Sequence, residues 1–299
     1  MTSSSGAIYL QAISDNNFNT NVAHPAFVKR HPKLLFDGAH NNAHNSQGTY
    51  KPFVDLMTSD GYIVAANKAA LSKKSLAGHD VLAIVNALGP SGQNESSPFT
   101  NEECDAVREW VNGGGTLLLV SDHAPFSAAA SDLAKRFGVE ITKGFTIDAV
   151  HYNKESLDQT QLVFSRDNGL LAEHPITRGR DATERINRVI SFSGTSLQGP
   201  PGSAELLKLS ETAKDVLPPD RKSASPDEPP ADHKTVSARG KAQAIALQFG
   251  KGRVVVVGEA AMLTAQVTPQ GLRFGMNVRV FDNRQLALNI MHWLSGLLK

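Results

Sequence analysis

Residues 80–122 read DVLAIVNALGPSGQNESSPFTNEECDAVREWVNGGGTLLLVSD, and this stretch predicts a buried strand, a helix and a second buried strand. The runs VLAIV and TLLLV are apolar at every position, which is typical of strands covered on both faces of a parallel sheet. Between them, Thr100 and Glu103 have the spacing of a capping box that begins a helix, and Gly113–Gly115 end it. Parallel strands joined by crossover helices indicate a doubly wound α/β sheet.

The same alternation extends to both sides of this stretch. The expected elements are strands over 33–37, 62–66, 242–249 and 253–257, and helices over 50–60, 126–138 and 283–298. The last helix carries an apolar stripe at helical spacing, Leu286, Ile290, Trp293 and Leu297. We therefore predict an α/β fold with a mostly parallel sheet, helices on both of its faces, and an irregular insertion after the fourth helix.

The chain is expected to form one domain with an N-terminal arm. Residues 1–31 are polar and rich in asparagine with no sustained period, so we interpret them as an arm on the domain surface. Residues 32–299 then make up the single α/β domain. Within it, residues 211–240 are rich in Pro, Asp, Lys and Ser, so we expect a surface excursion with almost nothing to bury.

The charge balance argues against nucleic acids and membranes as partners. The 299 residues include 30 Lys and Arg against 29 Asp and Glu, a formal net charge of +1, and no basic tract. No run approaches the roughly 18 apolar residues that a membrane helix needs. The opening MTSSSGAIYLQAIS lacks the regions of a signal peptide, so we expect a soluble protein, either cytoplasmic or exported with its leader removed. The expected partner is a small-molecule substrate.

Reactive side chains gather where the predicted strands end. In an open parallel sheet, ligands bind beyond the carboxyl ends of the strands, so we expect these side chains to bound one cleft. They are Asp37, His40 and His44 after the first strand, Asp122 and His123 after the fourth, and Glu259 after the last. The alternative for a single residue such as Asp122 is a helix N-cap.

Imidazoles and carboxylates in this combination could hold a divalent ion, zinc above all, with an open coordination position. The candidate ligands are Asp37, His40, His44, Asp122 and His123. Water bound to such an ion would attack an ester, lactone or amide, with Asp122 or Glu259 as the catalytic base. The sequence therefore predicts a metal-dependent hydrolase.

Two other functions stay open. A serine hydrolase is one alternative, with Ser121 or Ser196 as nucleophile, although VSDHA does not match the G-x-S-x-G elbow. A non-catalytic module that binds a sugar or another small molecule in the same cleft is the other. Cys104 is not expected to act as a nucleophile, because its acidic neighbours raise the pKa of the thiol. His151 and His174 lie in the irregular middle, either as loop residues or as contributors to the cleft.

Three stretches carry a resemblance to a known superfamily. KLLFDGAHNNAH, FTNEECDAVREWVNGGGTLLLVSDHAPF and GKGRVVVVGEAAMLTAQ together resemble a bacterial branch of the class I glutamine amidotransferase-like superfamily. The resemblance covers most of residues 32–150 and 240–299, and it implies a flavodoxin-like α/β core. Amidotransferases proper place a cysteine at the elbow after a central strand. The elbow here reads Val120-Ser121-Asp122-His123, so glutaminase chemistry is not expected.

Overall fold

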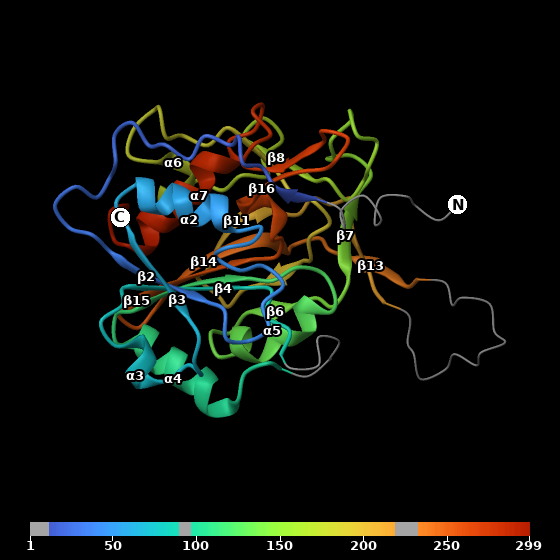
Figure 1. Ribbon diagram of the computed structural model, residues 1–299. Coiled ribbons are helices and arrows are strands. Elements are labelled where there is room, and N and C mark those ends of the chain that lie inside the picture. Colours follow the sequence, from blue (N-terminus) through green and yellow to red (C-terminus); the bar gives the residue numbers. More distant parts are fainter. Residues whose placement is uncertain (1–11, 90–96, 219–232) are drawn as a thin grey trace.

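The computed structural model describes residues 12–89, 97–218 and 233–299 (Figure 1). Within these residues nine strands form the central sheet, in the order β3, β2, β4, β5, β15, β14, β10, β6, with β11 beside β14. The bounds are β2 Lys33–Asp37, β3 Ile63–Asn67, β4 Val81–Val85, β5 Thr116–Val120, β6 Glu140–Ile141, β10 Leu197–Gln198, β11 Ala204–Lys208, β14 Ala242–Phe249 and β15 Gly252–Val257.

One half of this sheet is parallel and the other is antiparallel. The pairs β3–β2, β2–β4, β4–β5 and β5–β15 are parallel. From β15 onward, β14, β10, β6 and β11 are joined by antiparallel pairs. The strands VLAIV and TLLLV are buried at every position, as their composition predicts. The predicted α/β class is therefore confirmed, and the irregular middle supplies most of the antiparallel extension.

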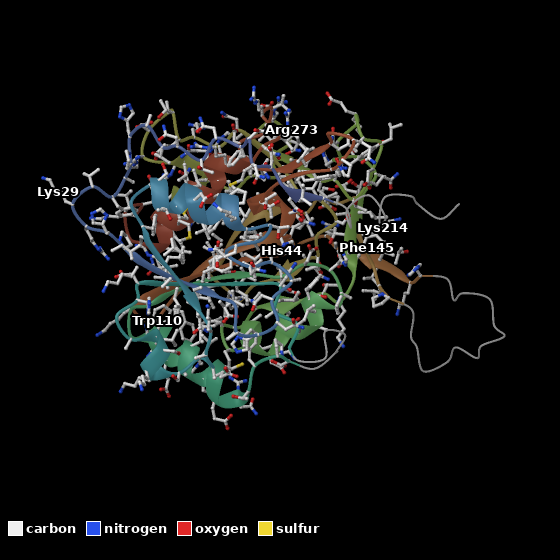
Figure 2. The ribbon with its side chains drawn as sticks, viewed as in Figure 1. Lys29, His44, Trp110, Phe145, Lys214 and Arg273 are labelled. Atoms are coloured by element: carbon white, nitrogen blue, oxygen red, sulfur yellow. The ribbon has the colours of Figure 1, made fainter. Side chains whose placement is uncertain are left out.

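Helices cover both faces of the parallel half, and side chains fill the space between them and the sheet (Figures 1 and 2). Successive side chains of a strand point to opposite faces, so Phe36 packs with α2 and α7 whereas Leu35 packs with α3 and α4. Cys104 of α4 belongs to the second group and is 1% exposed. The helix bounds are α2 Lys51–Ser59, α3 Lys73–Leu76, α4 Asn101–Asn112, α5 Phe126–Lys135 and α7 Asn283–Leu294.

The capping box that the sequence predicts at the start of α4 is confirmed. The Glu103 N–H donates to Thr100 Oγ1 at 3.2 Å, and the Thr100 N–H donates to Glu103 Oε2 at 3.0 Å. Two of the N–H groups that a helix start leaves unpaired are satisfied in this way. The box also fixes the position of the Glu103 carboxylate.

Short strands outside the central sheet build the rest of the molecule. They are β1 Ile13–Ser14, β16 Ala265–Val267 and β17 Arg273–Gly275 in one sheet, β7 Phe145–Asp148, β12 Ala213–Val216 and β13 Thr235–Ser237 in a second, and β8 Val163–Ser165 with β9 Arg188–Ile190 in a third. The short helices are α6 Pro175–Arg178 and the 3₁₀ turn η1 Ala261–Leu263. None of the described helices is long and apolar enough to cross a bilayer.

The predicted excursion over residues 211–240 needs correction at both ends. β12 and β13 fall inside it and pair with each other, and β12 also pairs with β7. Ala213 and Asp215 are buried, so this part of the segment does contribute to the interior. The proline-rich composition hid the alternation of a short strand. Residues 219–232 of the segment, like residues 1–11 of the predicted arm, lie outside the described residues.

Candidate functional site

Two carboxylates meet beyond the paired strands β5 and β15. Val120 lies opposite Val257 in the parallel register, so Asp122 and Glu259 follow their strands at equivalent positions. Side chains two positions apart share a face of a strand, and Val120 and Val257 both face α2 and α7. The register therefore brings the two carboxylates together, and the negative charge of Asp122 helps to raise the pKa of Glu259.

Glu259 is completely buried at the start of η1. Its two carboxylate oxygens accept hydrogen bonds from the N–H groups of Ala261 and Met262, each at 2.7 Å. Burial first, and then the charge of Asp122, raise the pKa of Glu259 well above its ordinary value. Glu259 therefore holds a proton to higher pH than an ordinary glutamate.

Asp122 is less deeply buried than the other two strand-end carboxylates. It is 9% exposed, whereas Asp37 and Glu259 are each 0% exposed. Burial raises the pKa of Asp122, and the charge of His123 and the N–H groups of His123 and Ala260 oppose this shift without cancelling it. A carboxylate with a raised pKa at a strand end is the arrangement expected of a general base.

Tyr50 and Asn86 lie beside this pair. The Tyr50 hydroxyl donates to the Ala260 carbonyl at 2.7 Å, and burial followed by the charges of Glu259 and Asp122 raises its pKa, so the phenol stays neutral. Asn86 Oδ1 accepts from the Asp122 N–H at 3.1 Å, and the Asn86 side chain also opposes the rise in the pKa of the Asp122 carboxyl. The φ of 43° at Asn86 is costly for a residue other than glycine. We call Tyr50, Asn86, Asp122 and Glu259 the Asp122 cluster.

A second group forms around His40. Its Nδ1 lies 2.9 Å from Asp37 Oδ2, and its Nε2 lies 2.9 Å from Glu103 Oε1. Burial alone would lower the pKa of His40, but hydrogen bonds to both carboxylates and their negative charges outweigh burial, and the pKa is raised. A protonated His40 therefore donates to Asp37 and Glu103 at once. These three residues are the His40 cluster.

Further donors satisfy the two carboxylates of the His40 cluster. Asn67 Nδ2 donates to Asp37 Oδ1 at 2.9 Å, and Asn42 Nδ2 donates to Asp37 Oδ2 at 3.1 Å. Glu103 Oε1 also accepts from the Leu71 N–H at 2.8 Å. A buried ion group of this kind is stable only when its charges are paired and its remaining hydrogen-bonding capacity is used. The His40 cluster meets that condition.

The two clusters lie on opposite faces of the sheet, so the single cleft predicted from the strand ends is two separate groups. Phe36 pairs with Ala83, which places Asp37 level with Ile84 on the face of α3 and α4. Tyr50 belongs to the core of the α2 face. In the described part of the chain, no hydrogen bond or ion pair joins one cluster to the other.

The predicted metal ligands do not converge. Both ring nitrogens of His40 face carboxylates, His44 Nδ1 contacts Thr49 Oγ1, and burial lowers the pKa of His44 to about 4. His123 Nδ1 contacts the Ala124 carbonyl at 2.9 Å. Within residues 12–89, 97–218 and 233–299, no group of three or more His, Cys, Asp or Glu side chains is placed to hold a metal ion.

The two candidate serines lack an activating base. Ser121 is completely buried and its Oγ has no hydrogen-bond partner. Ser196 Oγ donates to Asp215 Oδ2 at 2.7 Å, and Lys241 Nζ donates to the same oxygen at 2.9 Å. A serine nucleophile needs a hydrogen bond to the group that takes its proton, and Asp215 is already paired with lysine. Neither serine contacts a histidine in the described structure.

His151, His174 and Cys104 lie outside both clusters. His174 caps α6, where its Nδ1 accepts from the Ile176 N–H at 3.2 Å. His151 lines a separate cavity of about 380 Å³. Burial raises the pKa of the Cys104 thiol to about 11, in agreement with the expectation that it is not a nucleophile.

Three residues of the clusters were missed from the sequence. Glu103 was assigned only its capping role, yet the same spacing that identified the cap fixes the carboxylate that binds His40. Asn86 follows the end of β4, and the sequence does not mark it because an amide is not a reactive group by itself. Tyr50 had no signal, because nothing in the sequence pairs the start of α2 with Ala260.

Comparisons with known proteins reveal structural similarity only. No family model matches the chain, and no curated protein matches it. The solved structure described as "mmIFT52 N-terminal domain" aligns with a TM-score of 0.59 at 13% identity, covering 88% of this chain and 97% of that one. At this identity it supports the α/β fold and nothing finer.

Other solved structures align less closely. A putative ThuA-like protein from Bacteroides uniformis aligns with a TM-score of 0.45 at 15% identity, covering 95% of this chain and 97% of that one. A putative GMP synthase component from Thermoplasma acidophilum aligns with a TM-score of 0.45 at 9% identity, covering 90% and 96%.

Proposed function

We propose that this chain is a hydrolase of small-molecule esters, lactones or amides in which Asp122 is the general base. One observation carries the proposal: Asp122 is a buried carboxylate with a raised pKa, at the carboxyl end of a parallel strand and beside Glu259. A raised pKa makes a carboxylate a stronger base near neutral pH. The carboxyl edge of a parallel sheet is also where such folds bind ligands.

The Asp122 cluster contains the groups that the reaction requires. Asp122 would accept a proton from water as the water oxygen attacks the substrate carbonyl carbon. The Asn86 amide, which lies beside Asp122, would donate a hydrogen bond to the oxygen that becomes negative. The acid formed on Asp122 would then return its proton to the leaving oxygen or nitrogen as the scissile bond breaks. Glu259, held by the N–H groups of Ala261 and Met262, would act as a positioning residue beside Asp122.

The metal-dependent form of this reaction is a separate proposal. It would use zinc or another divalent ion held by Asp37, His40 and Asp122. In this form His40 would have to give up its contact with Asp37 or Glu103. Residues from both faces of the sheet would also have to meet in one site, so we rank this form second. Elemental analysis of protein purified without a His tag, together with activity before and after a chelator, distinguishes the two forms.

We also infer a flavodoxin-like member of the amidotransferase-like superfamily at the level of topology. The parallel strands lie in the order β3, β2, β4, β5, β15, which is the order 2-1-3-4-5 when they are numbered along the chain. The sequence resemblance around Asp37 and Asp122 supports the same assignment. It does not bear on the reaction.

The substitution Asp122→Asn tests the function. It keeps the size of the side chain and removes the base, so we expect hydrolysis of a panel of nitrophenyl esters and lactones to fall by about 10²- to 10⁴-fold. Asp132→Asn on α5, an exposed carboxylate, is the matched control and should keep full activity. Hydrolysis by the Asp122→Asn protein at the control rate, with its melting temperature unchanged, would rule out the proposed role.

A non-catalytic binding module is the alternative to both hydrolase forms. The complete burial of Asp37 and Glu259 favours it, because groups sealed from solvent serve structure more readily than turnover. This candidate predicts that small molecules raise the melting temperature while every substrate of the panel stays intact.

A further inference from the structure

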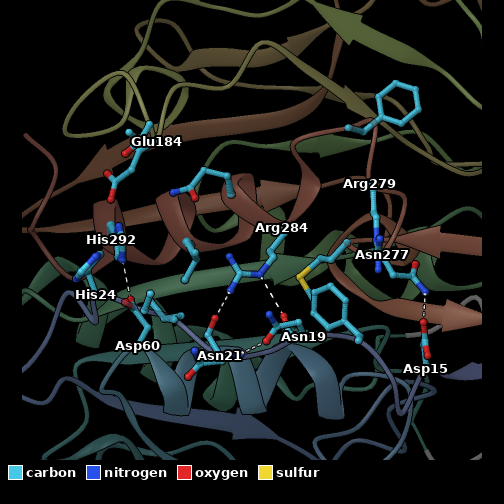
Figure 3. A pocket seen from close by; sticks show the side chains of 18 of the residues that line it. Asp15, Asn19, Asn21, His24, Asp60, Glu184, Asn277, Arg279, Arg284 and His292 are labelled. Atoms are coloured by element: carbon cyan, nitrogen blue, oxygen red, sulfur yellow. Dashed lines mark hydrogen bonds and ion pairs between the residues drawn. The ribbon is translucent and has the colours of Figure 1, made fainter.

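A cavity of about 750 Å³ lies between the N-terminal arm, α7 and the segment that follows β17 (Figure 3). Its lining includes no residue of the Asp122 cluster or the His40 cluster. Residues 15–24 of the arm form one wall, so the arm encloses space as well as lying on the surface. The volume falls in the range of sites that hold small molecules.

Each acidic side chain that lines this cavity has a hydrogen-bond partner within the protein. Glu184 pairs with Arg180, whose Nε lies 2.8 Å from Glu184 Oε1, and Asp60 Oδ2 lies 2.7 Å from His292 Nε2. The other two acidic side chains have neutral partners, Asp15 with Asn277 Nδ2 at 3.0 Å and Asp181 with Thr183 Oγ1 at 2.6 Å. Asp15 and Asp181 keep their negative charges, but within the described residues neither forms an ion pair with an arginine of the lining.

Arg284 of α7 is a half-buried cation without a carboxylate partner. Its guanidinium donates to the Asn21 carbonyl at 2.8 Å and to the Asn19 carbonyl at 3.4 Å (Figure 3). Burial lowers its pKa, which reflects the unfavourable removal of this charge from water. Such a charge is stabilised when an anion pairs with it. The charge of Asp60 offsets part of this cost, but within the described residues Arg284 makes no hydrogen bond or ion pair with a carboxylate.

Two more arginines line the same cavity. The side chains of Arg273 and Arg279 are exposed, and neither has a hydrogen-bond or ion-pair partner in the described structure. Together with Arg284 they provide three guanidinium groups that make no hydrogen bond or ion pair with a carboxylate of the described residues. Guanidinium groups match carboxylate and phosphate oxygens in a bidentate geometry.

We propose that this cavity binds a small polar molecule through a carboxylate or phosphate group, which Arg273, Arg279 and Arg284 recognise. The cavity is much larger than one such group, so the rest of the ligand occupies the space between the arm and α7. This site is separate from the proposed catalytic residues and does not depend on hydrolysis. The shared chemistry of the two ligand classes is an oxyanion.

Inorganic phosphate and malonate are the probes, with sodium chloride at equal ionic strength as the reference. We expect one of them to raise the melting temperature of the full chain saturably and to give a measurable Kd by titration calorimetry. Arg279→Ala should raise that Kd by about tenfold, the effect of losing one charge-assisted hydrogen bond. A response to phosphate alone identifies a phosphate ligand, and a response to malonate alone identifies a carboxylate ligand.

Arg239→Ala is the matched control, because it removes an exposed arginine paired with Glu211 outside the cavity. It should leave the Kd unchanged. Arg284 also binds the carbonyl groups of the arm, so its variant is Arg284→Lys rather than Arg284→Ala. Lysine keeps the charge but loses the bidentate geometry. Equal stabilisation of the wild type and Arg279→Ala, or no saturable response to either probe, overturns the proposal.

Discussion

His40 is held between two carboxylates of different origin. Asp37 lies on the same strand-to-loop segment, and Glu103 comes from the start of α4. The spacing of Asp37 and His40 marks them as neighbours in the sequence, and that contact could be predicted. The contact with Glu103 could not, because it depends on how α4 packs against the loop. Its consequence is that His40 acts as a buried cation, whereas a metal ligand would require a neutral imidazole.

The raised pKa of His40 makes stability depend on pH. A histidine whose pKa is higher in the folded state adds stability that is fully present below its ordinary value of 6.5 and is lost as the pH rises through the folded value. We expect the free energy of unfolding, from urea titrations at a series of pH values, to fall above pH 6.5. His40→Gln should lower it by about 3–5 kcal/mol at pH 6, because two buried carboxylates lose their cation.

The same substitution should make the fall above pH 6.5 smaller, since glutamine does not titrate, while Glu259, whose pKa is also raised, accounts for the part that remains. His24→Gln, at an exposed position, is the control and should retain the wild-type profile. A His40→Gln protein with the full wild-type pH dependence would contradict the assignment of the charge to His40.

At the level of elements, α4 and the strand ends determine which side chains meet. The buried runs and the capping box predicted the parallel strands and the helix between them. The sequence also placed Asp37, Asp122 and Glu259 at strand ends. It did not show that Asp37 is level with Ile84 on one face, whereas Asp122 and Glu259 follow Val120 and Val257 on the other. That difference comes from the register between strands, which local pattern does not encode.

The start of α4 offers a test of this double role. Thr100→Ala removes one capping hydrogen bond and should lower the free energy of unfolding by about 1 kcal/mol. Glu103→Gln should cost more, about 3 kcal/mol or above, because it also removes a charge that pairs with His40. Urea unfolding at pH 6 measures both, with Glu102→Gln in the same turn as the exposed control. Equal losses for the two variants would show that Glu103 serves the cap alone.

At the scale of the whole molecule, the parallel half and the antiparallel strand β14 were predictable, whereas the shortest antiparallel strands were not. Strands β2, β4, β5 and β15 are apolar runs bounded by helices or turns, and their local sequence specifies them. Strands β6 and β10 are two residues each and pair through residues such as Leu197 with Ile141 and Ala242. Segments this short have no period of their own, so only the assembled sheet defines them. The cavity beside Arg284 also arises from assembly, because the arm and α7 are far apart in the sequence.

The burial of Cys104 under α4 gives this protein an internal reporter of opening. It is the only cysteine of the chain, and a thiol reagent reaches it only in molecules whose α4 has separated from the sheet. We expect Ellman's reagent to release no colour from the folded protein during the time in which it reacts completely with the protein in urea. Rapid reaction in native buffer would mean that this face of the sheet opens easily.

The expected lack of reactivity of Cys104 in the folded protein has a practical use in spectroscopy. An engineered surface thiol, for example Lys29→Cys on the exposed arm, would be the single reactive position of the folded chain. A fluorophore or spin label could then be attached to the arm that walls the arginine-lined cavity, without first replacing the native cysteine. Movement of the arm on ligand binding could be followed directly with such a probe.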